Sequence, residues 1–124
     1  MEPALASTQL LQVLIVEDNP GDVYMTKLAL KQEMNFVAAV VTDGEPAIAY
    51  LRREGEYADV SRPDFVVLDL NLQEVDGGTV LRFIRNTPEL RGLLVFVLSS
   101  SPEDVMRDVA AQADCYICKP PNLD

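Results

Sequence analysis

Five short apolar runs, separated by amphipathic stretches, constrain the fold of this chain more than any other feature. The apolar runs span residues 13–16, 36–41, 65–68, 93–98 and 115–118. The stretches between them carry apolar residues at helical spacing, over residues 22–33, 45–53, 79–86 and 101–112. Strands separated by helices run parallel, and right-handed crossovers place the helices on both faces of the sheet. The pattern therefore predicts an α/β fold with a doubly wound, parallel, five-stranded sheet.

The polar residues that end the apolar runs are the first candidates for a functional site, because open parallel sheets carry their active crevice at the carboxyl ends of the strands. The third run is apolar at every position, as expected of a strand covered on both faces, and an acid follows it directly. The candidate residues at the strand ends are Glu17, Asp18, Asp69, Ser99 and Lys119.

These side-chain types suit phosphoryl chemistry with a divalent cation. Three carboxylates brought close together repel one another unless a cation lies between them. Oxygen ligands in a chain without histidine favour a hard ion such as Mg²⁺. A lysine and a hydroxyl nearby would complete a phosphoryl pocket, so the set indicates phosphoryl transfer to a carboxylate.

Each candidate also has an ordinary explanation. Residues 18–21, Asp-Asn-Pro-Gly, are all turn formers, and Asp76 with two following glycines is likewise typical of a turn. Lys119 could be a surface lysine, and the serines at 99–101 could serve only as caps. Asp69 is harder to explain in this way, because it directly follows an unbroken apolar strand. The joint placement of these groups at four strand ends is what favours a site.

The motifs at the strand ends resemble those of response-regulator receiver domains, the CheY-like family. The resemblance spans residues 12–120 and is carried by VLIVEDNPGD at 13–22, VLDLNL at 67–72, Asp-Gly at 76–77, VLS at 97–99 and YICKP at 116–120. It implies a flavodoxin-like sheet of strand order 2-1-3-4-5. It also implies that residues 1–124 form a single receiver domain, with residues 1–10 as an N-terminal extension.

The resemblance implies a role for each matching residue. Asp69 would be the phosphoacceptor, and Mg²⁺ would be held by Asp18, Asp69 and the backbone carbonyl of Asn71. Glu17 would bind the ion through water. For the acyl phosphate, Lys119 would pair with a phosphoryl oxygen and Ser99 would donate a hydrogen bond to it. Ser99 and the aromatic Tyr116 would form the switch, although Tyr116 could equally be plain packing.

Three departures from the family pattern bear on these roles. Gln73 stands where family members usually carry proline, and Ser99 replaces the commoner threonine. A receiver normally continues into a fifth helix after the Lys-Pro pair, whereas this sequence has Pro121 and ends five residues after Lys119. The last helix is therefore expected to be missing or atypical. An uncovered apolar face favours self-association, so a homodimer through the fourth helix and fifth strand is expected.

The resemblance also implies the partner class. The chain would act as a signalling switch, not a metabolic enzyme, catalysing only its own phosphorylation and dephosphorylation with a sensor histidine kinase as donor. The string RREGEY at 52–57 and the Asp-Asn-Pro start resemble the small receivers that accompany bacterial phytochromes. A net charge of −10 disfavours nucleic acid and anionic membranes as partners. A start with no basic residue argues against a secretory signal, so a cytoplasmic location is expected.

Alternative functions make different demands on the sequence. A flavodoxin-like FMN or nucleotide module would need a phosphate-cradling loop after the first strand, where Glu17 and Asp18 stand instead. A degenerate receiver used only as a scaffold would lack one of Asp18, Asp69 or Lys119. An aspartate-based phosphatase usually needs an acid two residues after the nucleophile, where this chain has Asn71.

The two cysteines form a C-x-x-C string, but a pair without histidine cannot complete a zinc site. Positions three apart on a strand point to opposite faces, which separates the two sulfurs. We expect Cys115 and Cys118 to be buried structural residues.

Overall fold

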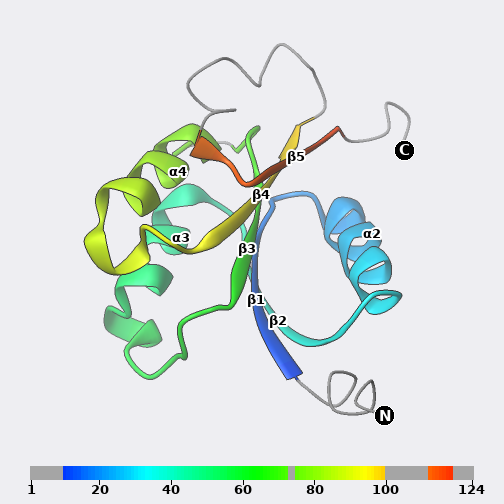
Figure 1. The fold of residues 1–124 in the computed structure, drawn as a ribbon, viewed down its shortest axis with the longest axis horizontal. Helices are drawn as coiled ribbons and strands as arrows, with labels where there is room; N and C mark the ends of the chain where they lie inside the picture. Colours follow the sequence, from blue (N-terminus) through cyan, green and yellow to red (C-terminus); the bar gives the residue numbers. More distant parts are fainter. Residues whose placement is uncertain (1–9, 73–74, 100–111, 119–124) are drawn as a thin grey trace.

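The five predicted strands form one parallel sheet, in the order β2-β1-β3-β4-β5 (Figure 1). The structure is a computed structural model and describes residues 10–72, 75–99 and 112–118. The predicted fold class and strand order are confirmed. The strands are β1 (Leu10–Val16), β2 (Asn35–Val41), β3 (Phe65–Asp69), β4 (Leu94–Ser99) and β5 (Cys115–Cys118).

Helices cover both faces of this sheet. Helix α2 (Pro20–Lys31) lies on one face, and α3 (Gly44–Arg52) and α4 (Gly77–Asn86) lie on the other (Figure 1). Two short 3₁₀ turns, η1 (Gly55–Tyr57) and η2 (Pro88–Leu90), follow α3 and α4. The fourth predicted helix falls mostly on residues 100–111, and the expected absence of a fifth helix concerns residues 119–124. Both lie outside the described residues.

The two faces of the sheet are buried to different depths. The face under α3 and α4 holds a large cluster of buried side chains, including Leu68 of β3 and Leu81 and Ile84 of α4. The face under α2 holds a smaller cluster, with Ile15 and Val67 at its centre. β3 contributes to both clusters and is buried along its whole length. Burying one such aliphatic side chain contributes about 1.5–3 kcal/mol, so β3 is firmly held.

Three side chains start the helices at the carboxyl end of the sheet. Asn19 accepts a hydrogen bond from the Asp22 amide at 3.0 Å and caps α2. Asp43 caps α3 and Asp76 caps α4. Caps of these types satisfy amides that have no partner in the first turn of a helix, and removing one costs about 1 kcal/mol. The chain after β1, β2 and β3 is therefore fixed close to the ends of those strands.

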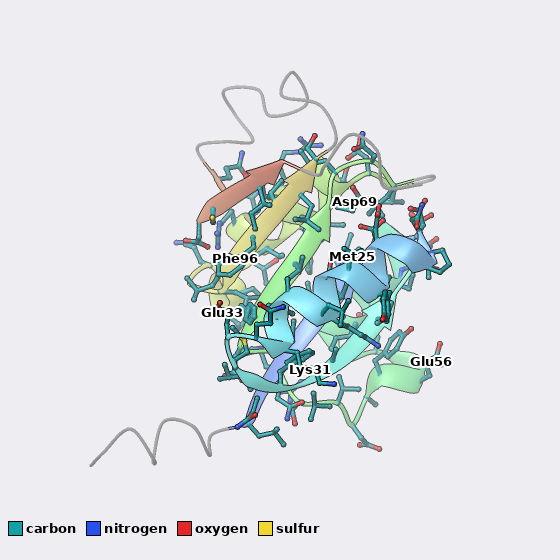
Figure 2. All side chains as sticks on the ribbon, turned by 90° about the vertical axis from the view of Figure 1, so that its right-hand side faces the viewer. Met25, Lys31, Glu33, Glu56, Asp69 and Phe96 are labelled. Atoms are coloured by element: carbon teal, nitrogen blue, oxygen red, sulfur yellow. The ribbon has the colours of Figure 1, made fainter. Side chains whose placement is uncertain are left out.

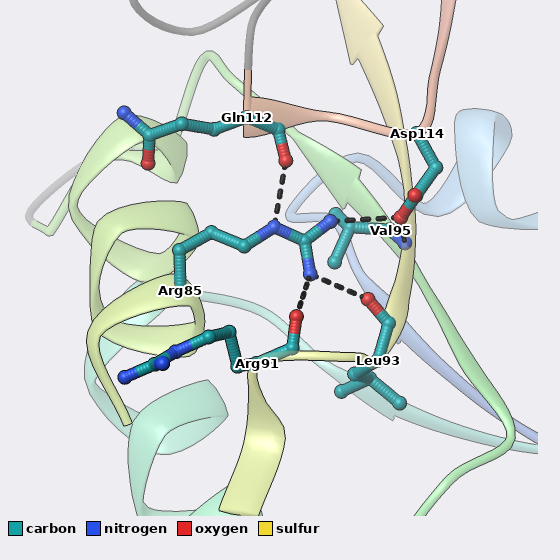
Figure 3. A network of polar contacts seen from close by, with 6 residues as sticks. All are labelled: Arg85, Arg91, Leu93, Val95, Gln112 and Asp114. Atoms are coloured by element: carbon teal, nitrogen blue, oxygen red, sulfur yellow. Dashed lines mark hydrogen bonds and ion pairs between the residues drawn. The ribbon is translucent and has the colours of Figure 1, made fainter. Parts of the chain in front are cut away.

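Arg85, near the end of α4, ties the amino ends of β4 and β5 to that helix (Figure 3). Its guanidinium donates to the carbonyls of Gln112 at 2.7 Å, Arg91 at 2.9 Å and Leu93 at 2.6 Å. It also pairs with a carboxylate oxygen of Asp114 at 2.7 Å, and that oxygen accepts the Val95 amide at 2.7 Å. We call this set the Arg85 network.

Cys115 corrects one expectation. Its side chain is exposed and its thiol is free, not buried as predicted. The physical reason is its position on β5, an edge strand that, among the described residues, pairs only with β4. The side chain of Cys118 lies outside the described residues. No helix in the described ranges is long and apolar enough to cross a membrane.

Candidate functional site

Three carboxylates meet at the carboxyl end of the sheet. Glu17, Asp18 and Asp69 each offer an oxygen, and these oxygens lie within 4.8 Å of one another. Glu17 and Asp69 are each 1% exposed, and Asp18 is half-buried. In Figure 2, Asp69 lies at the upper end of the sheet, whereas Lys31, in the last turn of α2, lies toward the opposite end. We call these three residues the acidic cluster.

Strand pairing brings the members of the acidic cluster together. β1 and β3 are neighbours, with Val16 in register with Leu68, so Glu17 and Asp69 are the next residues along the two paired strands. Paired strands lie about 4.7–4.9 Å apart, which accounts for the closeness of the two carboxylates. The amide of Glu17 donates to the carbonyl of Val41 at 3.0 Å, which extends the pairing with β2 to this residue.

The loop after β3 is bonded to the carboxylate of Asp69 and to β4. The amide of Asn71 donates to Oδ1 of Asp69 at 3.0 Å, and the amide of Leu70 donates to the carbonyl of Leu98 at 3.0 Å. On the neighbouring turn, the amide of Asn19 donates to Oε2 of Glu17 at 3.3 Å. The acidic cluster is therefore held by backbone groups of the two turns that follow β1 and β3.

Gly77 is where the chain returns closest to Asp69. A Cβ at this position would lie 2.4 Å from the carbonyl oxygen of Asp69 and 2.8 Å from Cα of Leu70. No real side chain tolerates such distances, so only glycine allows α4 to begin against the backbone of Asp69. The sequence suggested a turn at Gly77 and Gly78, but both belong to the first turn of α4, which Asp76 caps through the Thr79 amide at 2.9 Å.

The remaining predicted site residues are placed only in part. Ser99 is fully buried at the end of β4, one residue beyond the pairing of Leu98 with Asp69. Asn71 is exposed, two residues past Asp69. Lys119 and the side chain of Tyr116 lie outside the described residues, so their predicted roles stay predictions. The structure thus brings together Glu17, Asp18 and Asp69 and places Ser99 on the adjacent strand end.

The donor set of the acidic cluster fits a divalent cation. Two of its three carboxylates are buried, and placing such charges side by side away from water is unfavourable unless a positive charge joins them. Carboxylate and carbonyl oxygens are the ligands that Mg²⁺, Mn²⁺ and Ca²⁺ prefer. Glu17, Asp18 and Asp69 are therefore the residues that could hold such an ion.

Asp43, which follows the second apolar run, was not among the candidates taken from the sequence. Its Oδ1 accepts the amide of Val75 at 2.9 Å, across 32 residues of sequence, and the amide of Gly44 at 2.6 Å. Val75 belongs to the segment that returns from Asp69 to α4. An aspartate directly before a helix is typical of a cap, but nothing in the sequence indicated a contact with the Asp69 loop.

Comparison with known proteins agrees with this geometry. The family model for the response regulator receiver domain matches residues 13–124. Response regulator Rcp1 of Synechocystis sp. is 35% identical over 114 residues, covering 90% of this chain and 78% of Rcp1.

Two solved structures are similar throughout. The phosphorylated cyanobacterial phytochrome response regulator RcpA has a TM-score of 0.85 and 42% identity, covering 93% of this chain and 84% of that chain. The Mn²⁺-bound form of Rcp1 has a TM-score of 0.84 and 34% identity, covering 91% and 84%. With the strand order and the placement of the acidic cluster, these matches show that the chain belongs to the response regulator receiver domain family of two-component signal transduction.

Proposed function

We propose that Asp69 is the phosphoacceptor of this receiver, and that a sensor histidine kinase supplies the phosphoryl group. The observation that carries the proposal is the acidic cluster, with Asp69 buried at the end of the central strand beside Glu17 and Asp18. Similarity to phytochrome response regulators supports a kinase of the bacterial phytochrome type as the donor.

The proposed reaction transfers a phosphoryl group from nitrogen to oxygen. A carboxylate oxygen of Asp69 attacks the phosphorus of a phosphohistidine, forming an O–P bond as the P–N bond breaks. The electron pair of that bond leaves on the imidazole nitrogen, which takes a proton from solvent. β3 is buried along its length, so the attacking carboxylate is carried by a rigid support.

We propose Mg²⁺ as the resident ion, held by Asp18, Asp69 and the backbone carbonyl of Asn71, with Glu17 binding through water. The ion would neutralise the negative charge that the carboxylates and the phosphoryl oxygens bring together. Lys119 would pair with a phosphoryl oxygen. Ser99, buried at the end of β4, would donate its hydroxyl to the phosphoryl group, and Tyr116 would respond to the movement of Ser99.

Phosphorylation by acetyl phosphate with Mg²⁺, read by intact mass within minutes, tests the acceptor. Wild type should gain one phosphoryl group, and Asp69→Asn, or chelation of the metal, should abolish the gain. Asp64→Asn is the matched control, because Asp64 directly precedes the other end of the same strand, where its carboxylate accepts the Gln12 amide at 2.7 Å. A folded wild type without gain would favour the scaffold alternative.

We also propose that the chain forms a homodimer through the fourth predicted helix, residues 101–112, and the β5 side of the sheet. Leu94 of β4 and Ile117 of β5 are 49% and 43% exposed, and their register places them on the same face as the smaller cluster. Light scattering at micromolar concentration should give the mass of a dimer for wild type. Tyr24→Asp should also give a dimer, because Tyr24 is an exposed side chain of α2, away from the proposed interface. Ile117→Asp should give a monomer. A monomeric wild type would contradict the proposal.

A further inference from the structure

Asp43 reaches the loop after the acceptor from a different part of the fold. It follows β2 and caps α3, and its half-buried carboxylate accepts the Val75 amide at 2.9 Å. The same oxygen, Oδ1, accepts the amide of Gly44 at 2.6 Å. One carboxylate oxygen thus joins the start of α3 to the segment that precedes α4.

The approach of the two segments is close as well as hydrogen-bonded. A Cβ on Gly44 would lie 2.3 Å from the carbonyl oxygen of Val75 and 2.6 Å from its Cγ1. The turn at Asp43 and Gly44 therefore packs directly on Val75. The contact therefore depends on two features: residue 44 has no side chain, and the Val75 amide donates to Asp43.

Along the chain, Val75 connects the contact with Asp43 to the segment that packs against the backbone of Asp69. Two residues after Val75, Gly77 lies against the carbonyl of Asp69, and its amide donates to the carbonyl of Leu70 at 3.4 Å. On the other limb of the loop, the Asn71 amide donates to Asp69. Asp43 is thus one of the contacts that hold the returning limb, as the Asp69 carboxylate is for the outgoing limb.

We propose that Asp43 is a positioning residue for phosphoryl acceptance, acting through Val75 to hold the loop that carries the Asn71 carbonyl beside Asp69. The inference rests on the proposed function, because a precise loop matters only if that loop supplies a metal ligand. Groups that orient the ligands of a metal contribute about 10–100-fold to its affinity. Loss of the Asp43 oxygen should therefore weaken metal binding without removing any ligand.

The test compares Asp43→Ala with Asp43→Asn by titrating the purified chain with Mn²⁺ and by measuring its phosphorylation with acetyl phosphate. The two variants lose the same charge, but the amide keeps an oxygen that can accept the Val75 amide. Asp43→Ala should raise the dissociation constant for Mn²⁺ about 10-fold and slow phosphorylation at subsaturating metal. Asp43→Asn should stay within about 3-fold of wild type, because the positioning oxygen is restored.

Asp114→Ala is the matched control. Asp114 also accepts a backbone amide from another element, that of Val95 at 2.7 Å, but it does so in the Arg85 network. It should lower stability to urea and leave the dissociation constant for Mn²⁺ unchanged. Exchange of the Val75 amide should be faster in Asp43→Ala than in wild type or Asp114→Ala.

Each other outcome has a definite meaning. If folded Asp43→Ala binds Mn²⁺ with wild-type affinity, this inference is wrong and the proposed function stands. The same holds if Asp43→Asn binds Mn²⁺ as weakly as Asp43→Ala, because the charge of Asp43 would then be responsible. If Asp43→Ala does not fold, Gly44→Ala decides, because its methyl group must displace Val75 while Asp43 remains. Affinity near wild type in Gly44→Ala then overturns the inference. A wild type that binds no metal overturns the proposed function and this inference together.

Discussion

The two ends of the sheet use carboxylates in opposite ways. At the amino ends of β4 and β5, Asp114 is paired with Arg85 at 2.7 Å, and the guanidinium also donates to three carbonyls (Figure 3). At the carboxyl end, Glu17, Asp18 and Asp69 face one another. Neighbouring opposite charges stabilise a fold, whereas neighbouring like charges favour a ligand that relieves them. The amino end of the sheet therefore holds the fold together, whereas the carboxyl end is where we propose that the reaction takes place.

The largest expected effect is the loss of stability when the Arg85 network at the amino end of the sheet is broken. Arg85→Met keeps the apolar stem but removes all four described donor contacts, and it should lower the free energy of unfolding by about 3 kcal/mol. Urea unfolding followed by circular dichroism measures this loss. Arg82→Met, on an exposed arginine of the same helix, should change stability by less than about 0.5 kcal/mol. Slower phosphorylation of folded Arg85→Met would show that the two ends are not separate.

The second largest expected effect is stabilisation by metal binding at the carboxyl end of the sheet. If Mg²⁺ is the resident ion, it should stabilise the chain by about 2.7 kcal/mol at a hundred times its dissociation constant, because the acidic cluster forms only in the folded state. The same increment should appear in Arg85→Met, since the ion and the Arg85 network lie at opposite ends. Thermal unfolding with and without Mg²⁺ checks both values. Unequal increments would mean that the ends are coupled.

Asp18→Asn should change binding but not the fold. Losing one carboxylate ligand should weaken metal binding at least about 10-fold, which is about 1.4 kcal/mol. Because the change removes one of three mutually repelling charges, the metal-free chain should not become less stable to unfolding. Calorimetric titration with Mg²⁺ measures the affinity, and Asp22→Asn in the first turn of α2 is the control. A large loss of metal-free stability would assign Asp18 to the fold instead.

The smallest expected effect is the loss of stability when the ion pair at the amino end of the sheet is removed. Asp114→Asn keeps an oxygen for the Val95 amide but loses the charge that pairs with Arg85. The pair is partly exposed, so the loss should be about 1 kcal/mol or less. Raising the salt concentration should reduce the difference from wild type. A loss as large as that of Arg85→Met would mean that the ion pair, and not the carbonyl contacts, dominates the network.

The sequence was sufficient to predict all five strands and to place Glu17, Asp69 and Ser99 at the ends of three of them. Periodicity, however, does not fix their ends. β1 begins at Leu10, three residues before the predicted start, because residues 10–12 pair with residues 35–37 of β2. β4 runs one residue further, to include Ser99. Helix α2 begins at Pro20 and not at Asp22, because Asn19 caps it and proline suits the first turn.

The contacts that could not be predicted are those between residues far apart in sequence. Asp43 and Val75 are 32 residues apart, and only the packing of α3 beside the β3 loop brings them together. Most arginines near the end of a helix are solvated, and no signal in the sequence indicated the Arg85 network. The partners of Arg85 became apparent only once β4 and β5 were placed beside α4.

The acidic cluster depends on how far each strand extends, since β1 and β3 end at the same level of the sheet. Deleting one residue within either strand would draw its tip back by about 3.3 Å and turn the following side chains to the opposite face. The connection that contains η1, at the other end of β3, has no such constraint, because doubling the length of a loop costs only about 0.6 kcal/mol. Insertions and deletions should therefore accumulate there during evolution, while the strands keep their lengths.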